Sequence, residues 1–214
     1  MKLIAPSLLA ADFLNLGEAC KFINESSADW LHLDVMDGTF VPNISFGFPV
    51  MDAIAPVCRK PLDVHLMIVH PEKYAERFCQ AGAYSVGFHL EAVNDPEPIL
   101  AMIRKQGVHT CLTINPDIEV ERLRPYISKV DMVLLMSVFA GYGGQKFIEG
   151  TYDRIAHLRR IMDEEGFHPL LEIDGGVNSD NAPTLFDAGA DVLVAGTAVF
   201  RAENPDEVIR KMKS

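Results

Sequence analysis

Residues 30–38, with the sequence WLHLDVMDG, form a strand-length apolar run that ends in polar residues and a glycine. The chain contains eight such runs, rich in Val, Ile and Leu and without strict alternation of polar residues. They are Leu3–Leu8, Trp30–Met36, Leu62–Met67, Ser85–Leu90, Thr110–Ile114, Met132–Val138, Leu170–Ile173 and Val192–Ala195. Because runs of this kind are typical of parallel strands buried on both faces, we predict a strand at each.

Longer segments with helical spacing lie between these runs. Leu16, Cys20 and Ile23, for example, would share one face of a helix. The phrases Ala81-Gly82-Ala83 and Ala188-Gly189-Ala190 each stand just before a run, which predicts the same helix-to-strand joint used twice. Strands that alternate with helices in this way are typical of a parallel sheet with crossover helices.

Two architectures contain such a sheet, the open doubly wound sheet and the closed (β/α)₈ barrel. Eight strand-and-helix units in 214 residues favour the barrel, and no Gly-x-Gly-x-x-Gly follows the first run to indicate a dinucleotide-binding sheet. No linker rich in Gly, Ser or Pro divides the chain. We therefore predict one α/β domain over residues 1–214, folded as a single (β/α)₈ TIM barrel.

Composition and charge argue against several classes of protein. The chain has 19 basic and 30 acidic residues, and a net charge of −11 makes it a poor binder of nucleic acid or of an anionic membrane. Its longest nearly apolar run, 132–141, is shorter than the ~20 residues of a membrane-spanning helix. The N-terminal residues contain no export signal, and the four cysteines lack metal-site spacing. We therefore predict a cytoplasmic protein with reduced thiols, whose partner is neither a nucleic acid nor a membrane.

Polar side chains end three of the predicted strands. His32 and Asp34 are two residues apart and so point to the same face of their strand, while His65 and Asp174 stand near the ends of two others. In a barrel, the active site forms at the carboxyl ends of the strands. Any one of these residues alone would be interpreted as a hydrogen-bonded strand-end group. Two imidazoles and two carboxylates together favour a divalent metal ion, with Zn²⁺ and Fe²⁺ both compatible.

The two carboxylates indicate a chemistry. A metal ion on a carbonyl oxygen stabilises a developing enediolate and so acidifies the neighbouring C–H group. Asp34 and Asp174, on well-separated strands, would flank a flat intermediate. One carboxylate could then remove a proton from one face while the other returns a proton to the opposite face, which is what epimerisation requires.

Glycines after the last three strands predict a phosphate site, because loops after strands 7 and 8 of barrels commonly bind phosphate through backbone N–H groups. Any one of these glycine segments alone could be only a tight turn. The set consists of Gly141, Gly143, Gly144, Gly175, Gly176 and Gly196, followed by Thr197. Met36, Met67 and Met136 also stand near strand ends, where they would either fill the core or form an apolar cover that excludes water.

Several longer motifs accompany these residues. They are IAPSLLAADF (4–13), HLDVMDG with FVPN (32–43), DVHLM (63–67), FHLE (88–91), GGQKF (143–147) and DGGV (174–177). With these motifs the chain closely resembles the ribulose-phosphate 3-epimerase family, from its N-terminus to residue 198.

The resemblance implies a ribulose-phosphate-binding (β/α)₈ barrel. It would be a homo-oligomer that interconverts D-ribulose 5-phosphate and D-xylulose 5-phosphate in the pentose phosphate pathway. It implies one divalent ion, Zn²⁺ or Fe²⁺ with Mn²⁺ or Co²⁺ possible, held by His32, Asp34, His65 and Asp174. Asp34 and Asp174 would be the acid and base. The substrate-binding residues would be Ser7 and His65 near the sugar, the three methionines over the enediolate, and Gly141, Gly143, Gly144, Gly175, Gly176, Gly196 and Thr197 around the phosphate.

One departure from the family stands in the loop after the sixth strand. The family usually carries a polar residue and a proline where this chain has Phe139-Ala140. Loss of the proline removes a restraint on φ, so we expect a more mobile loop, and a restored proline would tighten binding if loop order matters. Phe139 could either pack under the loop or alter the sugar pocket.

Other interpretations stay open at this point. A 3-epimerase of a six-carbon ketose phosphate, such as D-allulose 6-phosphate, would share most of the motifs. A metal-dependent hydrolase on the same barrel and a barrel that binds sugar phosphate without turnover are further alternatives. His89 and Glu91, at the end of the fourth strand, could bound the pocket or form a structural hydrogen-bonded pair.

Overall fold

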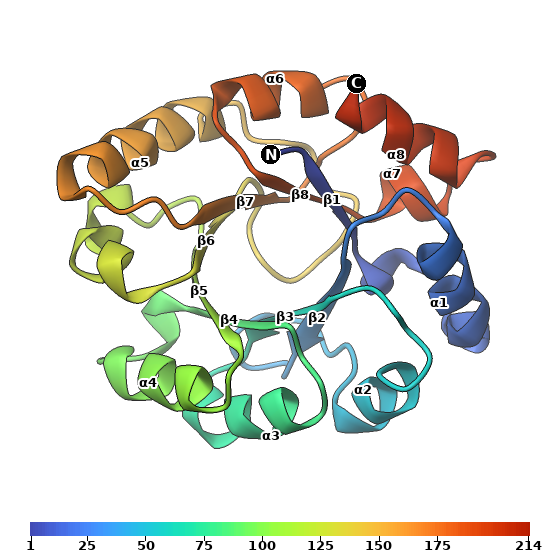
Figure 1. The fold of residues 1–214 in the computed structure, drawn as a ribbon, viewed down its shortest axis with the longest axis horizontal. Helices are drawn as coiled ribbons and strands as arrows, with labels where there is room; N and C mark the ends of the chain where they lie inside the picture. The colour runs from blue at the N-terminus through green and yellow to red at the C-terminus, as the bar shows by residue number, and fades with distance from the viewer.

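The structure, a computed structural model, describes residues 1–214. Eight parallel strands surround a central axis, with the helices outside them (Figure 1). Hydrogen bonds connect the strands in the order β1-β8-β7-β6-β5-β4-β3-β2, and a bridge between Ser7 and His32 joins the two ends of that order. The predicted (β/α)₈ barrel is therefore confirmed.

The strands agree closely with the predicted runs. They are β1 (Leu3–Pro6), β2 (Leu31–Met36), β3 (Leu62–Met67), β4 (Ser85–His89), β5 (His109–Ile114), β6 (Met132–Met136), β7 (Leu170–Asp174) and β8 (Val192–Ala195). The runs predicted for β3 and β8 match fully, and the others differ by one or two residues at one end. At β1 the difference arises because Leu8 already begins a 3-10 turn, which the side chain of Ser7 caps.

Helices lie outside the barrel, where α1 to α6 connect successive strands and α7 and α8 follow the last strand. They are α1 (Leu16–Glu25), α2 (Phe48–Ile54), α3 (Ala75–Gln80), α4 (Glu97–Lys105), α5 (Thr151–Glu165), α6 (Ala182–Ala188), α7 (Thr197–Phe200) and α8 (Pro205–Lys213). The connection between β5 and β6 is instead a 3-10 segment, Val120–Lys129, which contains Pro125. Proline lacks the N–H that an α-helix interior needs, so this crossover cannot form a regular α-helix.

The two Ala-Gly-Ala joints have the same geometry, as predicted. Gly82 and Gly189 end α3 and α6 with φ angles of 100° and 120°, a region that favours glycine. The following alanine N–H then donates back into the helix, from Ala83 to the carbonyl of Phe78 and from Ala190 to that of Leu185. Each joint turns the chain from a helix directly into the next strand.

Alternate residues of the strands face two different cores. A cluster of 49 buried residues fills the space between the barrel and its helices. A cluster of nine, including Ala5, Leu134 and Val194, lies on the opposite strand faces, inside the barrel. His32 and Asp34 alternate with residues of the outer cluster, so they also point inward. The barrel interior therefore combines a small apolar core with a group of polar side chains.

Candidate active site at the carboxyl ends of the strands

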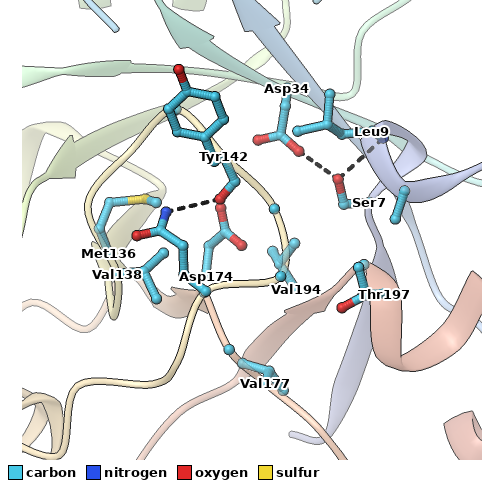
Figure 2. A pocket seen from close by; sticks show the side chains of 18 of the residues that line it. Ser7, Leu9, Asp34, Met136, Val138, Tyr142, Asp174, Val177, Val194 and Thr197 are labelled. Atoms are coloured by element: carbon cyan, nitrogen blue, oxygen red, sulfur yellow. Dashed lines mark hydrogen bonds between the residues drawn. The ribbon is translucent and has the colours of Figure 1, made fainter. Parts of the chain in front are cut away.

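A cavity of about 300 Å³ lies at the carboxyl ends of the strands. Asp34 and Ser7 face it from one side and Asp174 and Met136 from another (Figure 2). The predicted site residues that line it are Ser7, Asp34, Met36, Met67, Met136, Gly141, Gly143, Gly144, Asp174, Gly175, Gly176, Gly196 and Thr197. His32 and His65 are not among the lining residues, because both rings are buried within the barrel.

The four predicted metal ligands lie together. One potential ligand atom of each of His32, Asp34, His65 and Asp174 lies within 4.8 Å of every other. Asp34 Oδ1 is 3.3 Å from both His32 Nε2 and His65 Nδ1. Asp174 Oδ2 is 4.0 Å and 3.9 Å from the same two nitrogens. The other oxygen of Asp34 accepts a hydrogen bond from the Ser7 hydroxyl at 2.5 Å.

The two imidazole nitrogens that face this cluster, His32 Nε2 and His65 Nδ1, are buried and have no hydrogen-bond partner. Buried polar atoms rarely stay unsatisfied in proteins. The other nitrogen of each ring is held in place, His32 Nδ1 by Asp63 at 2.6 Å and His65 Nε2 by His89 at 2.9 Å. Partners of this kind orient metal-binding imidazoles. The cluster therefore fits a divalent metal ion, which would satisfy both nitrogens.

The environment separates the pKa values of the two carboxyl groups. Burial opposes ionisation of Asp34, but His32 and His65 outweigh it and hold the pKa of Asp34 below its ordinary value. Burial, and then the negative charge of Asp34, raise the pKa of Asp174 to about 7. A carboxylate and a carboxylic acid can thus face one cavity near neutral pH, as expected of an acid and base that act together.

Glycines form another end of the cavity. A Cβ atom on Gly144 would lie 3.7 Å from Thr197 Cγ2, so the loop after β6 lies against the start of α7. Gly176 has a φ of 66°, and a Cβ there would lie 2.5 Å from the backbone nitrogen of Phe147. Only glycine fits such a position. Backbone in this arrangement can approach an anion closely, which suits a phosphate group.

Comparison with known proteins agrees with this geometry. Residues 3–200 match the model of the Ribulose-phosphate 3 epimerase family. The chain is 45% identical over 213 residues to the ribulose-phosphate 3-epimerase of Synechocystis sp., covering 99% of this chain and 93% of that protein. It is 42% identical over 211 residues to the ribulose-phosphate 3-epimerase of Bacillus subtilis, covering 98% of this chain and 97% of that protein. The chain belongs to the ribulose-phosphate 3-epimerase family.

The barrel itself is shared beyond the epimerase family. A mutant tryptophan synthase α-subunit from Pyrococcus furiosus has a similar structure, with a TM-score of 0.73, 16% identity, and coverage of 99% of this chain and 96% of that one. At this low identity the similarity shows the fold alone. None of the helices has the length and apolar character needed to cross a membrane.

The loop after β6, where this chain departs from the usual epimerase sequence, is held by side chains. The N–H of Ala140 donates to Asn115 Oδ1 at 3.0 Å, a bond that a proline could not make. Phe139 does not pack under the loop, since it is about half exposed and lines the cavity. The Asn115 bond therefore takes the place of the restraint that proline would supply.

Two further contacts join this loop to the loop after β2. Asn43 Nδ2 donates to the carbonyl of Gly141 at 2.8 Å, and the Tyr142 hydroxyl donates to the carbonyl of Pro42 at 2.5 Å. Within the loop, the Gln145 amide donates to the carbonyl of Tyr142 at 2.8 Å. The two loops thus cover the cavity together.

These contacts reverse the effect that we expect from a restored proline. Ala140→Pro removes the N–H donor and leaves the part-buried Asn115 Oδ1 without its partner, which costs about 1 kcal/mol. We expect the KM for the sugar phosphate to rise about three- to tenfold, measured by steady-state kinetics. Ala140→Ser keeps the N–H and should leave the KM near the wild-type value. A lower KM in the proline variant would show that the φ restraint outweighs the bond.

Sequence analysis missed a second polar layer inside the barrel. Asp63 and Glu172 stand two residues before His65 and Asp174, so they point to the same inner face, and this spacing could have revealed them. Asp63 is held between His32 Nδ1 and the Ser85 hydroxyl. Burial first, and then Asp63, raise the pKa of Glu172 well above its ordinary value. Glu172 therefore lies beneath the cluster in surroundings that disfavour its ionisation.

His89 and Glu91 form the structural pair that was one of the two alternatives. Neither lines the cavity, and His89 Nδ1 lies 3.0 Å from Glu91 Oε1. The same Glu91 oxygen accepts a hydrogen bond from Asn115 Nδ2 at 2.8 Å. A continuous chain of polar contacts therefore runs from His65 through His89, Glu91 and Asn115 to the N–H of Ala140.

Proposed function

We propose that this protein interconverts D-ribulose 5-phosphate and D-xylulose 5-phosphate by epimerisation at C3, as a step of the pentose phosphate pathway. The observation that carries the proposal is the cluster of two imidazoles and two carboxylates that meets one cavity, with the pKa values of the carboxyl groups pushed apart. The names of the close relatives support the choice of substrate.

We assign the metal site to His32, Asp34, His65 and Asp174. A divalent ion bound there would stabilise the negative charge that develops on the substrate oxygens when the C3 proton leaves. Two imidazoles and two carboxylates suit Zn²⁺ or Fe²⁺, and Mn²⁺ or Co²⁺ are compatible with the same donors.

The two aspartates perform the proton transfers. Asp34, whose carboxylate is held by the Ser7 hydroxyl, removes the C3 proton of one epimer from its own side of the cavity. Asp174 gives a proton to C3 from the other side of the cavity. The C3 configuration is thereby inverted. In the reverse direction the two groups exchange roles. Because one turnover leaves a proton on Asp34 and removes one from Asp174, both groups must exchange protons with solvent before the next turnover in the same direction.

The remaining residues bind and shield the substrate. Met36 and Met67 are buried against Val41, and together with Met136 they give the reacting end an apolar cover that excludes water. Ser7 lines the cavity beside the reacting end, where it can contact the sugar, whereas His65 is buried behind this wall and would serve as a metal ligand only. The glycines and Thr197 accept the phosphate at the other end of the cavity.

The test is a coupled assay of metal-loaded protein with D-ribulose 5-phosphate and, separately, with D-allulose 6-phosphate. We expect the five-carbon substrate to have the larger kcat/KM. Faster turnover of the six-carbon ketose phosphate would overturn the assignment of substrate while keeping the epimerase chemistry. Hydrolysis products would indicate a metal-dependent hydrolase, and binding without turnover would indicate a barrel that has lost activity.

We also propose that the enzyme works in the cytoplasm as a homo-oligomer. All four cysteines are free thiols, as is usual for proteins of a reducing compartment.

The proposed oligomer is supported by exposed apolar side chains. Leu14 and Ile44 expose most of their apolar side chains on the loops at the mouth of the barrel. A second copy of the chain would shield such residues from water.

A further inference from the structure

Arg201 is the one cationic side chain among the residues that line the cavity, and Asp34 and Asp174 are the two anionic ones. Four other arginines of this acidic chain have carboxylate partners, as Arg159 has in Asp191 at 2.6 Å. The guanidinium of Arg201, in contrast, forms neither an ion pair nor a hydrogen bond within the protein. It is therefore available to a ligand.

The single turn α7 determines the position of Arg201. The N–H of Arg201 donates to the carbonyl of Thr197 at 3.1 Å. The two residues are thus one helical turn apart, and their side chains lie on the same side of the turn. Thr197 stands at the cavity wall (Figure 2) and lies against Gly144. Arg201 is consequently placed at the end of the cavity that the glycines form.

We propose that Arg201 binds the phosphate group of the substrate through its charge and so strengthens substrate binding. The proposal rests on the proposed function and deepens it. A phosphate dianion is repelled by Asp34 and Asp174 and attracted by a guanidinium. The planar guanidinium can also donate two parallel hydrogen bonds to phosphate oxygens, in addition to those from the backbone.

Such a contact should contribute to binding rather than to the chemical step. The phosphate does not react, so its contact with Arg201 has the same strength in the ground state and the transition state. We expect Arg201→Gln to raise the KM for D-ribulose 5-phosphate about tenfold and to weaken the binding of inorganic phosphate by a similar factor. The kcat of this variant should stay within about twofold of wild type.

Two further variants make the test specific. Arg201→Lys keeps the charge and should recover part of the lost affinity. Arg160→Gln is the matched control, because Arg160 is an exposed arginine on α5 that has no ion pair and does not line the cavity. Salt screens an exposed charge contact. The KM of wild type, Arg201→Lys and Arg160→Gln should therefore rise with ionic strength, while that of Arg201→Gln should change much less.

Direct binding of inorganic phosphate, measured by calorimetry, separates this proposal from the proposed function because it needs no turnover. If wild type does not convert D-ribulose 5-phosphate but Arg201→Gln still weakens phosphate binding, the proposed function fails and the role of Arg201 stands. If wild type is active and Arg201→Gln matches Arg160→Gln in KM, phosphate affinity and salt dependence, the role of Arg201 is overturned. Thermal unfolding of each variant establishes that the comparison is made on folded protein.

Discussion

Replacing Asp174 with asparagine should lower the kcat for D-ribulose 5-phosphate by about 10³-fold, because the variant loses the group that gives a proton to one face of C3. Asparagine has nearly the same shape but cannot transfer the proton. The cavity and the apolar cover should stay intact, so the loss would appear in kcat more than in KM. Steady-state kinetics at saturating substrate measure this loss.

Because the two aspartates act on opposite faces of C3, the proposed mechanism predicts a difference between their variants in deuterated water. In Asp174→Asn, Asp34 can still remove a proton from C3 and return a deuteron to the same face, so one epimer exchanges its C3 hydrogen without inversion. In Asp34→Asn, Asp174 acts alone on the opposite face. We therefore expect the two variants to exchange opposite epimers, observed by NMR. Exchange of the same epimer by both variants would contradict the two-face mechanism.

Metal content must be measured in the same samples, since Asp174 is assigned both to metal binding and to proton transfer. Asp174 Oδ2 lies about as far from His32 Nε2 as from His65 Nδ1, at 4.0 Å and 3.9 Å. Loss of this carboxylate should weaken metal binding, and kinetics should be compared at a metal concentration that saturates both proteins. Full activity of Asp174→Asn would remove Asp174 from the mechanism.

The sequence predicts the strands of the barrel well because each buried strand is indicated by the apolar residues of its own run. The runs of Val, Ile and Leu are buried on both faces whatever their partners are, so they predict β3 and β8 to the residue. The helical segment between β5 and β6 is a 3-10 helix and not an α-helix for a reason that is also local, namely Pro125. The strand-end positions of His32, Asp34, His65 and Asp174 then follow from the fold, because parallel strands bring their carboxyl ends together.

Features that depend on contacts between distant residues could not be predicted in the same way. The bond from Ala140 to Asn115 joins two loops that are 25 residues apart, so the departure from the family sequence suggested only a lost restraint. Arg201 lies beyond the last recognisable motif, and its place in the cavity depends on the one turn of α7. Neither residue forms a spacing pattern that points to the site.

Removal of the metal ion should abolish epimerisation almost completely and should restore the repulsion between Asp34 and Asp174 that raises the pKa of Asp174. We expect activity below about 1% of wild type after chelation, because the developing enediolate charge then lacks its main stabilisation. Activity should return on addition of Zn²⁺ or Fe²⁺. The metal-loaded protein should also unfold at a higher temperature than the chelated protein, since an ion that binds only the folded state stabilises it.

Two histidine variants connect this loss to the proposed ligands. His65→Ala removes a buried imidazole whose Nδ1 has no other partner and should lower both metal stoichiometry and the gain in Tm. His70→Ala is the matched control, because His70 is exposed and lies 3.1 Å from Glu72, beyond the end of β3. Measurements at about pH 8, above the raised pKa of Asp174, keep that carboxylate ionised for the metal ion. An unchanged stoichiometry in His65→Ala, or activity that survives chelation with no metal detected, would contradict the metal-assisted mechanism.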